Sequence, residues 1–178
     1  MDSASLSEAI IAELGAVFVD EVRRVGPALV ASDLDGIEQQ VQDLGRRVLG
    51  RVVEQTVAAI AAAEPSAAPA CAGCQGAMRL VARARERALQ GLVGDYTLYR
   101  SYFVCDGCHR GAAPLDARLG LGRGMLSPGL GRVAGRAGLE AAFEPAAGLP
   151  RETLRIDVAE EAVRRITEGI GAVAEAEQ

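Results

Sequence analysis

The sequence contains no tryptophan and no lysine, and it has three tyrosines, three phenylalanines and one histidine in 178 residues. So few aromatic residues argue against a core of stacked aromatic sheets. Hydrophobic residues nevertheless make up 49% of the chain, which is ample for a core of small aliphatic side chains in helices. The guanidinium group of arginine therefore supplies every fixed positive side-chain charge, and its planar donors match phosphate oxygens well.

Long apolar runs are also missing. A membrane-spanning helix needs about 18 or more consecutive apolar residues, and no stretch of this sequence approaches that length. The first residues, MDSASLSEAIIAELG, place no basic cluster before an apolar run, so they do not form a secretory signal. We therefore expect a cytoplasmic protein that does not enter a membrane. In that compartment, paired cysteines are more often metal ligands than disulfides.

The net charge of −5 is unevenly distributed. Counting arginines against acidic residues gives −6 for residues 1–70, +6 for residues 71–136 and −5 for residues 137–178. The positive charge thus lies in the segment that holds all four cysteines. This asymmetry suggests an anionic partner for the middle third, although a solvated surface can carry the same excess.

The cysteines form two Cys-x-x-Cys pairs, Cys71 with Cys74 and Cys105 with Cys108, separated by 30 residues. Zinc prefers four soft ligands at the corners of a tetrahedron, and each pair offers two thiolates from one tight turn. Four thiolates leave no open coordination position, so we expect one structural zinc ion. Two disulfides or four buried free thiols are the alternatives.

Between the cysteine pairs the side-chain pattern changes to period two, from Arg79 to Cys105. This pattern predicts two strands joined near Gly94-Asp95, with the glycine at the first position of a tight turn. The hairpin brings the two cysteine pairs together. We therefore expect a zinc ribbon over residues 71–116.

Arginines alternate along these predicted strands. Arg83, Arg85 and Arg87 lie two residues apart and so project from one face of the first strand. Arg100 on the second strand can join them. Such a row can follow a phosphate backbone and bind DNA. A solvated face whose arginines pair with acidic helices explains the pattern equally well, and the sequence leaves both interpretations open.

The N-terminal third shows apolar residues at three- and four-residue steps. One stripe occupies residues 5–25 until Gly26-Pro27 interrupts it, and a second follows the helix-start signal Ser32-Asp33. A Pro- and Ala-rich linker is expected at residues 64–70. Residues 1–64 are therefore predicted to form either an antiparallel helical hairpin or one half of a helical dimer seam.

The C-terminal region, residues 117–178, is predicted to be helical. A loop is expected at residues 110–116, and Ser127-Pro128 then provides a capping hydroxyl followed by proline at the first helical position. The expected helices lie at residues 128–141, 143–149 and 158–173.

The last two predicted helices, joined by a turn through Pro150, have the order of a helix-turn-helix motif. Arg164 and Arg165 on the second of them are candidate DNA contacts, since recognition helices present arginine to base edges and phosphates. Glu160 and Glu161 lie on the same helix. A plain helical bundle is therefore the alternative.

Several short motifs in this order resemble the N-terminal region of Kra-type insertion-sequence transposases. The motifs are C-x-x-C (71–74), YRSYFVC (99–105), Cys108, Gly111, PLD (114–116), LGL (119–121), LSPGL (126–130), FEPAA (143–147) and AVRRITE (162–168), with a weaker match at DLDGIE (33–38). The resemblance covers most of the chain, and its middle motifs are the most specific.

The resemblance implies a zinc ribbon and a helix-turn-helix assembly that bind DNA at transposon ends. In full-length relatives an RNase-H-like nuclease follows. This sequence ends at Gln178, about where that nuclease would begin, and it contains no Ser/His/Asp set and no phosphate-binding loop. We therefore expect a DNA-binding portion of a transposase that is not itself an enzyme and takes no small-molecule substrate.

The predicted fold is α+β and mainly helical, with an N-terminal helical hairpin, a central zinc-ribbon β-hairpin and C-terminal helices of helix-turn-helix type. The expected partners are zinc, DNA and a second copy of the chain. A zinc-ribbon module that binds protein and no DNA is the alternative function.

Overall fold

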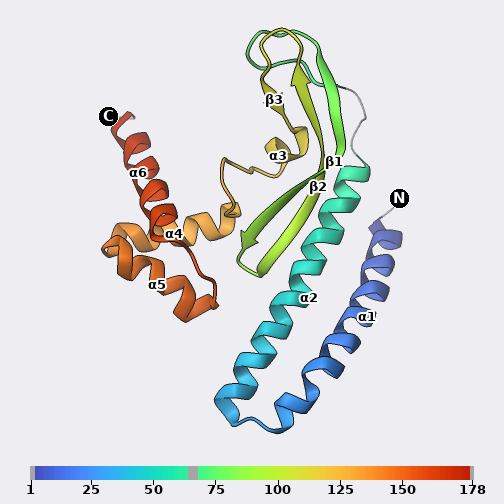
Figure 1. The fold of residues 1–178 in the computed structure, drawn as a ribbon, viewed down its shortest axis with the longest axis vertical. Helices are drawn as coiled ribbons and strands as arrows, with labels where there is room; N and C mark the ends of the chain where they lie inside the picture. Colours follow the sequence, from blue (N-terminus) through green and yellow to red (C-terminus); the bar gives the residue numbers. More distant parts are fainter. Residues whose placement is uncertain (1–2, 64–67, 177–178) are drawn as a thin grey trace. The chain divides into compact units, whose positions relative to one another are not determined.

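The computed structural model describes residues 3–63 and 68–176, and it confirms an α+β fold that is mainly helical (Figure 1). Its elements in chain order are α1 (Ser3–Val30), α2 (Leu34–Ala62), β1 (Met78–Gly91), β2 (Gly94–Cys105), β3 (Gly111–Ala112), α3 (Pro114–Arg118), α4 (Pro128–Glu140), α5 (Phe143–Leu154) and α6 (Glu160–Ala176). No helix among the described residues combines the length and the apolarity that a membrane span requires.

The chain divides into two compact units. The first comprises residues 1–89 and 93–120, with the N-terminal helices and most of the sheet. The second comprises residues 90–92 and 121–178, with the three C-terminal helices. The predicted division into three regions stays a prediction.

Helices α1 and α2 pack side by side as an antiparallel hairpin (Figure 1). As predicted, a new helix begins after Ser32-Asp33, and the Asp33 carboxylate accepts a hydrogen bond from the Gly36 amide at 3.0 Å. The predicted break at Gly26-Pro27 is wrong, because α1 continues through Pro27 to Val30. Proline removes one amide donor, so α1 lacks the hydrogen bond that residue 27 would have donated one turn back, and the helix ends three residues later.

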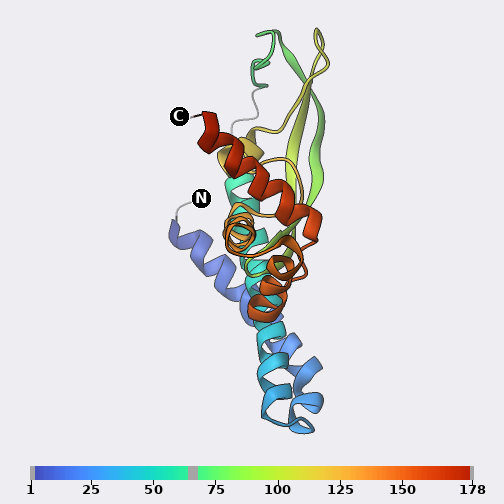
Figure 2. The ribbon, with the colours of Figure 1, turned by 90° about the vertical axis from the view of Figure 1, so that its left-hand side faces the viewer.

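Strands β1 and β2 form a long hairpin, and β2 also pairs with β3, giving the order β1-β2-β3 (Figure 2). The turn between β1 and β2 consists of Leu92 and Val93, so the predicted turn at Gly94-Asp95 lies two residues too far along the chain. Gly94 is the first residue of β2, and its φ of 111° lies in the region that favours glycine. A Cβ there would also lie 3.2 Å from the Arg46 carbonyl oxygen in α2.

The segment after Cys108 contains regular structure where a loop was predicted. Gly111–Ala112 forms β3 against Phe103 and Val104 of β2. The short helix α3 follows, with Pro114 in its first turn. Both elements hold the segment against β2, so the ribbon has a third strand. The predicted linker at 64–70 lies mostly outside the described residues, and Ala70 forms an isolated bridge with Ala77.

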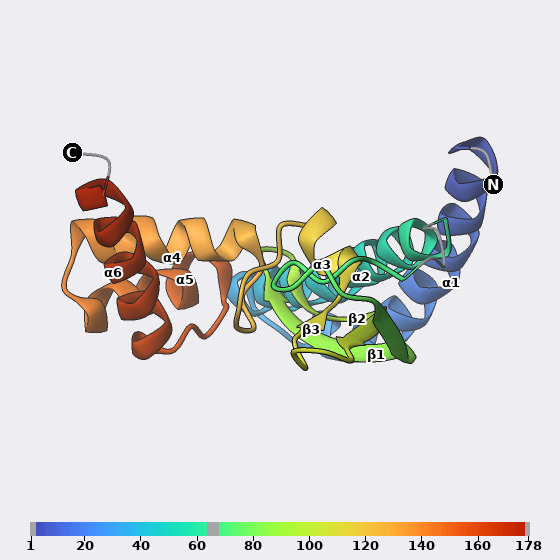
Figure 3. The ribbon, with the colours of Figure 1, turned by 90° about the horizontal axis from the view of Figure 1, so that it is seen from above.

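Helices α4, α5 and α6 pack against one another in the second unit (Figure 3). Their core contains Leu130, Ala134, Ala137, Ala146, Ile156, Val158 and Val163. The predicted cap is confirmed, since Ser127 Oγ accepts a hydrogen bond from the Leu130 amide at 3.2 Å.

The predicted turn through Pro150 is wrong, because Pro150 lies inside α5. Its ring is fully buried. We attribute its place in the helix to this packing, which offsets the loss of one backbone hydrogen bond. The helix instead ends at Leu154, where Arg155 takes the left-handed conformation with a φ of 52°.

Candidate metal centre

The two Cys-x-x-Cys segments lie at the same end of the β1–β2 hairpin, because one precedes β1 and the other ends β2 (Figures 1 and 2). Their backbones have the same hydrogen-bond pattern. The Cys71 amide donates to the Gly76 carbonyl at 3.0 Å, and the Cys105 amide donates to the Arg110 carbonyl at 2.9 Å. Each segment is therefore a closed turn, here called a knuckle, that presents two sulfur atoms on one side.

Each knuckle also contains a residue in the left-handed conformation directly after its second cysteine. These residues are Gln75, with a φ of 60°, and His109, with a φ of 58°. Their amides donate to the carbonyls of Cys71 at 2.8 Å and Cys105 at 3.0 Å. The left-handed residue reverses the chain direction and closes the turn. This backbone conformation costs free energy for a residue other than glycine, and it persists only where the surrounding structure fixes it.

The four sulfur atoms converge, with all of them within 4.8 Å of one another. Cys71 Sγ lies 3.4 Å from Cys108 Sγ, and Cys74 Sγ lies 3.4 Å from Cys105 Sγ and 3.6 Å from Cys108 Sγ. Zinc–thiolate bonds of about 2.3 Å in a tetrahedron place neighbouring sulfurs about 3.8 Å apart. The four cysteines therefore fit a single ion such as zinc, as predicted, and no disulfide joins them.

One half of the centre is buried and the other is exposed. Cys71 is 1% exposed and Cys105 is fully buried, whereas Cys74 and Cys108 are exposed. The two buried cysteines pack with Met78 and Phe103 in a small core, to which Leu80 and Ala112 add partial cover. The first cysteine of each knuckle thus belongs both to the centre and to the core of the hairpin.

Backbone amides favour the thiolate form of the buried cysteines. Amides of Cys74 and Gly73 point at Cys71 and, with the nearby thiol of Cys108, lower its pKa to about 6. The Cys108 amide, the Cys74 thiol and the Gly107 amide likewise lower the pKa of Cys105. These amides stabilise negative charge on the sulfur atom. They do so both when the thiol loses its proton and when the thiolate binds a metal ion.

Cys74 behaves in the opposite way. The Gly76 amide lowers its pKa, but the three neighbouring sulfur atoms together raise it to about 12. Four thiols this close cannot all lose their protons without a cation between them. The donor set therefore suits a positive ion at its centre.

The predicted DNA-binding arginines of the sheet fall into two groups. Arg83 and Arg85 are exposed on β1. The side chains of Arg87 and Arg100 are only 14% and 9% exposed, and both reach the carboxylate of Asp116 in α3. The structure thus brings Arg87 and Arg100 together, as a shared face predicts, but around an acidic residue of the same chain.

Arg85 lies over the ring of Tyr102, with the guanidinium carbon 4.0 Å from the ring centre. Gly111 lies beside the hydroxyl end of the same ring, because a Cβ there would lie 1.9 Å from the Tyr102 hydroxyl oxygen. Tyr102 therefore occupies the space that a side chain at Gly111 would take. The Arg85 side chain is exposed beside this ring.

Arg164 and Arg165 are exposed on α6. Glu161 pairs with Arg164 one turn away and, as the largest influence, raises the pKa of that guanidinium. The first turn of α6 carries Glu160 and Glu161. These carboxylates would repel the phosphates that a recognition helix approaches with its N-terminal end.

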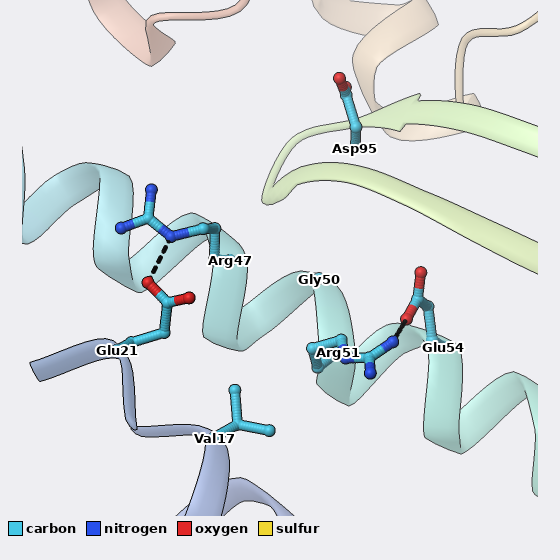
Figure 4. Close-up of a pocket in the computed structure, with 7 residues that line it drawn as sticks. All are labelled: Val17, Glu21, Arg47, Gly50, Arg51, Glu54 and Asp95. Carbon is cyan, nitrogen blue, oxygen red and sulfur yellow. Dashed lines mark hydrogen bonds and ion pairs between the residues drawn. The ribbon is translucent and has the colours of Figure 1, made fainter. Parts of the chain in front are cut away.

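An open cavity of about 250 Å³ lies in the first unit (Figure 4). It is lined by Val17, Glu21, Arg47, Gly50, Arg51, Glu54 and Asp95. Four of the five charged lining residues form ion pairs, since Arg47 lies 2.6 Å from Glu21 and Arg51 lies 2.6 Å from Glu54. The first pair ties α2 to α1, and the second lies within α2.

The sequence analysis did not predict the roles of Asp116, which pairs with two arginines, and of Tyr102, which contacts Arg85. Pro114 followed by Asp116 was a signal for a helix start, since proline and acidic residues both favour the first turn. That signal predicts the short helix α3. It does not predict the two arginines that come to its carboxylate, because their approach depends on how the strands pair.

Comparisons with protein families, curated proteins and solved structures found no match to this chain. The fold and the site by themselves define an α+β protein whose sheet ends in a cluster of four cysteines that could hold a metal ion.

Proposed function

We propose that this chain is a zinc-dependent DNA-binding protein that corresponds to the DNA-binding portion of a Kra-type transposase. The observation that carries the proposal is the convergence of four thiols at one end of an arginine-bearing hairpin. Zinc fits this centre better than harder cations do, because thiolate is a soft ligand and the four sulfurs are spaced for a tetrahedron.

The ion has a structural role in this proposal. Two of its four ligands, Cys71 and Cys105, belong to the small core that includes Met78 and Phe103. Binding the metal therefore fixes both ends of the hairpin, and the free energy of metal binding becomes folding free energy. The strand that carries Arg83 and Arg85 is then held in one conformation.

The proposed DNA contacts are Arg83 and Arg85, which are exposed and two residues apart on β1. Arg87 and Arg100 support this face through Asp116. The excess positive charge of residues 71–136 supports an anionic partner. The C-terminal helices have a weaker case, because Glu160 and Glu161 stand in the first turn of α6.

The test is DNA binding by the zinc-loaded chain at a series of salt concentrations. Neutralising phosphates releases counterions, so affinity for a duplex should fall steeply as salt rises. The double variant Arg83→Ala/Arg85→Ala should bind more weakly and lower the salt slope by about two. The control Arg136→Ala/Arg151→Ala removes the same charge from exposed positions on α4 and α5 and should leave the slope unchanged.

If the two double variants had the same affinity and the same salt slope, the assignment of the DNA contacts to β1 would be contradicted.

The proposed relation to transposases has its own test. It compares binding to a duplex that carries the ends of an insertion element with binding to a shuffled duplex. A sequence-specific binder should prefer the element ends by about 1,000-fold or more. Absence of any preference would leave DNA binding in place and remove the transposase proposal.

A protein-interaction module is the second candidate, and a specific observation favours it. Among the described side chains of the N-terminal helical hairpin, eight large apolar ones are exposed: Ile11, Phe18, Val19, Val22, Val30, Leu34, Val41 and Leu49. Such a surface is typical of protein contacts. A zinc-loaded chain that binds no duplex even at low salt would favour this function over the first.

A further inference from the structure

The described side chains of helix α1 include one exposed apolar face. Its members are Ile11, Phe18, Val19 and Val22, with exposed fractions from 39% for Val22 to 68% for Ile11. At 100° per residue these positions fall within an arc of about 100°, so they form a single stripe, here called the α1 stripe. An apolar stripe of this width on a helix ordinarily packs against another helix.

Gly15 lies in the middle of the α1 stripe. The position that its Cβ would occupy has no atom within 4 Å, so the helix surface there is open and flat. A flat spot between larger side chains lets a second helix approach closely. The stripe therefore has the form of a helix contact with its centre at Gly15.

One charge within the arc of the stripe and one beside it determine which helix fits. Glu8 lies seven residues before Gly15 and Arg23 lies eight residues after it, and both are exposed. A second α1 packed antiparallel about Gly15 places Glu8 of each copy opposite Arg23 of the other. A parallel pair would instead set Glu8 against Glu8 and Arg23 against Arg23, and like charges repel.

The apolar residues obey the same symmetry. Ile11 and Val19 each lie four residues from Gly15, so an antiparallel partner brings Ile11 of one copy against Val19 of the other. We infer that the α1 stripe is a homodimer interface in which two copies pack antiparallel across a two-fold axis at Gly15. The interface is isologous, as in most dimers, and it does not depend on DNA binding.

Arg23 is available for this contact. In its own chain it reaches Asp20 at 3.7 Å, and both side chains are more than three-quarters exposed. Such a surface pair is weak. Dimerisation thus exchanges a loose contact within one helix for a contact between two helices at the edge of an apolar stripe.

The first experiment measures the mass of the zinc-loaded chain by light scattering. The expected mass is twice 18.5 kDa. Phe18→Glu/Val22→Glu should give a monomer with unchanged helix content and zinc content. Val30→Glu is the control, since Val30 is 90% exposed but lies outside the proposed contact, and it should stay dimeric. A wild-type monomer at the highest soluble concentration would overturn the inference.

A charge exchange tests the orientation. Glu8→Arg and Arg23→Glu should each raise the dimer dissociation constant on the order of tenfold, since each breaks two symmetry-related pairs and creates repulsion. The variant carrying both changes should return close to the wild-type value. Additive weakening in the combined variant would exclude the antiparallel arrangement.

A cross-link tests the axis. Gly15→Cys places the two new thiols on the two-fold axis, so mild oxidation of the zinc-loaded chain should give a covalent dimer. Asp20→Cys, five residues away and on the opposite side of α1, is the matched control and should stay monomeric on a denaturing gel. Equal cross-linking of both would overturn the proposed interface, whatever the outcome of the DNA-binding tests.

Discussion

Arg100 Nε lies 2.7 Å from Asp116 Oδ1, in a pair whose side chains are 9% and 17% exposed. The other carboxylate oxygen of Asp116 accepts a hydrogen bond from Arg87 at 2.7 Å. A different nitrogen of Arg100, Nη1, donates hydrogen bonds to the backbone carbonyls of Arg85 and Glu86 at 3.0 and 3.1 Å. These bonds join β1, β2 and α3, so two of the predicted DNA-binding arginines hold the sheet together.

Asp116→Ala should therefore destabilise the protein strongly. Removing the carboxylate leaves Arg87 and Arg100 facing each other with little water to separate them, and breaking a buried ion pair costs about 3–5 kcal/mol. Urea unfolding of the zinc-loaded chain measures the loss. Asp106→Ala is the matched control, because its pair with Arg79 is more than 60% exposed on both sides and should contribute about 0–1 kcal/mol.

Similar losses in the two aspartate variants would show that the Asp116 cluster is no more than a surface contact. Arg83→Ala should also lie near zero, since its side chain is exposed.

Removing the metal should loosen one part of the chain selectively. Two ligands, Cys71 and Cys105, form half of the buried core at the knuckle end of the hairpin, whereas the core of α4, α5 and α6 contains no cysteine. After treatment with a chelator, amides at residues 71–112 should lose hydrogen-exchange protection while those at 128–170 keep it. Mass spectrometry of the exchanged peptides gives both readouts in one experiment.

Cys71→Ser/Cys105→Ser should reproduce the chelator effect without chelator. Protection that falls equally in both regions would show that the whole chain depends on the ion. Unchanged protection at residues 71–112 would contradict a structural metal.

Metal affinity should fall as pH falls, because protons compete with the ion for sulfur. In the metal-free chain Cys71 has its pKa lowered to about 6 by the amides of Cys74 and Gly73, so it is already a thiolate at neutral pH. Cys74, with its pKa raised to about 12, still holds its proton. Binding at neutral pH should therefore release fewer than four protons per ion.

Each proton released makes affinity fall about tenfold per pH unit. As pH drops through about 6, Cys71 takes up a proton as well, so the slope should steepen by one proton. Calorimetry in buffers of different ionisation enthalpy counts the protons. Release of four protons at neutral pH would contradict the lowered pKa of Cys71.

The parts of the fold that follow from local chemistry were predictable from sequence. Asp33 and Ser127 open their helices through their own side-chain oxygens, and the alternation in the central segment reports two strands directly. The two Cys-x-x-Cys pairs predict their own meeting, because the strands between them are of nearly equal length. The metal centre is thus the most predictable part of the molecule.

Two of the errors concern proline, and tertiary packing accounts for only one of them, since Pro27 is exposed and Pro150 is buried. Pro27 and Pro150 were expected to end helices, and both lie inside them, near the end of α1 and in the buried core respectively. The contact between Asp116 and Arg100 depends on how β3 and α3 fold back onto β2. No periodicity in the sequence reports that return.

The last prediction concerns Gly111 and Tyr102. A Cβ at Gly111 would lie 1.9 Å from the Tyr102 hydroxyl oxygen and 2.6 Å from the ring carbon that bears it, so Gly111→Ala must displace the ring. The displaced ring loses its contact with Arg85, and overpacking of this kind costs about 1–3 kcal/mol. Tyr102→Ala opens the same space. Gly111→Ala in the Tyr102→Ala background should therefore cost little, and the double-mutant cycle should show coupling above about 0.5 kcal/mol. Additive effects in urea unfolding would mean that the ring does not fill the space over Gly111, and the Arg85 face would then lack its aromatic support.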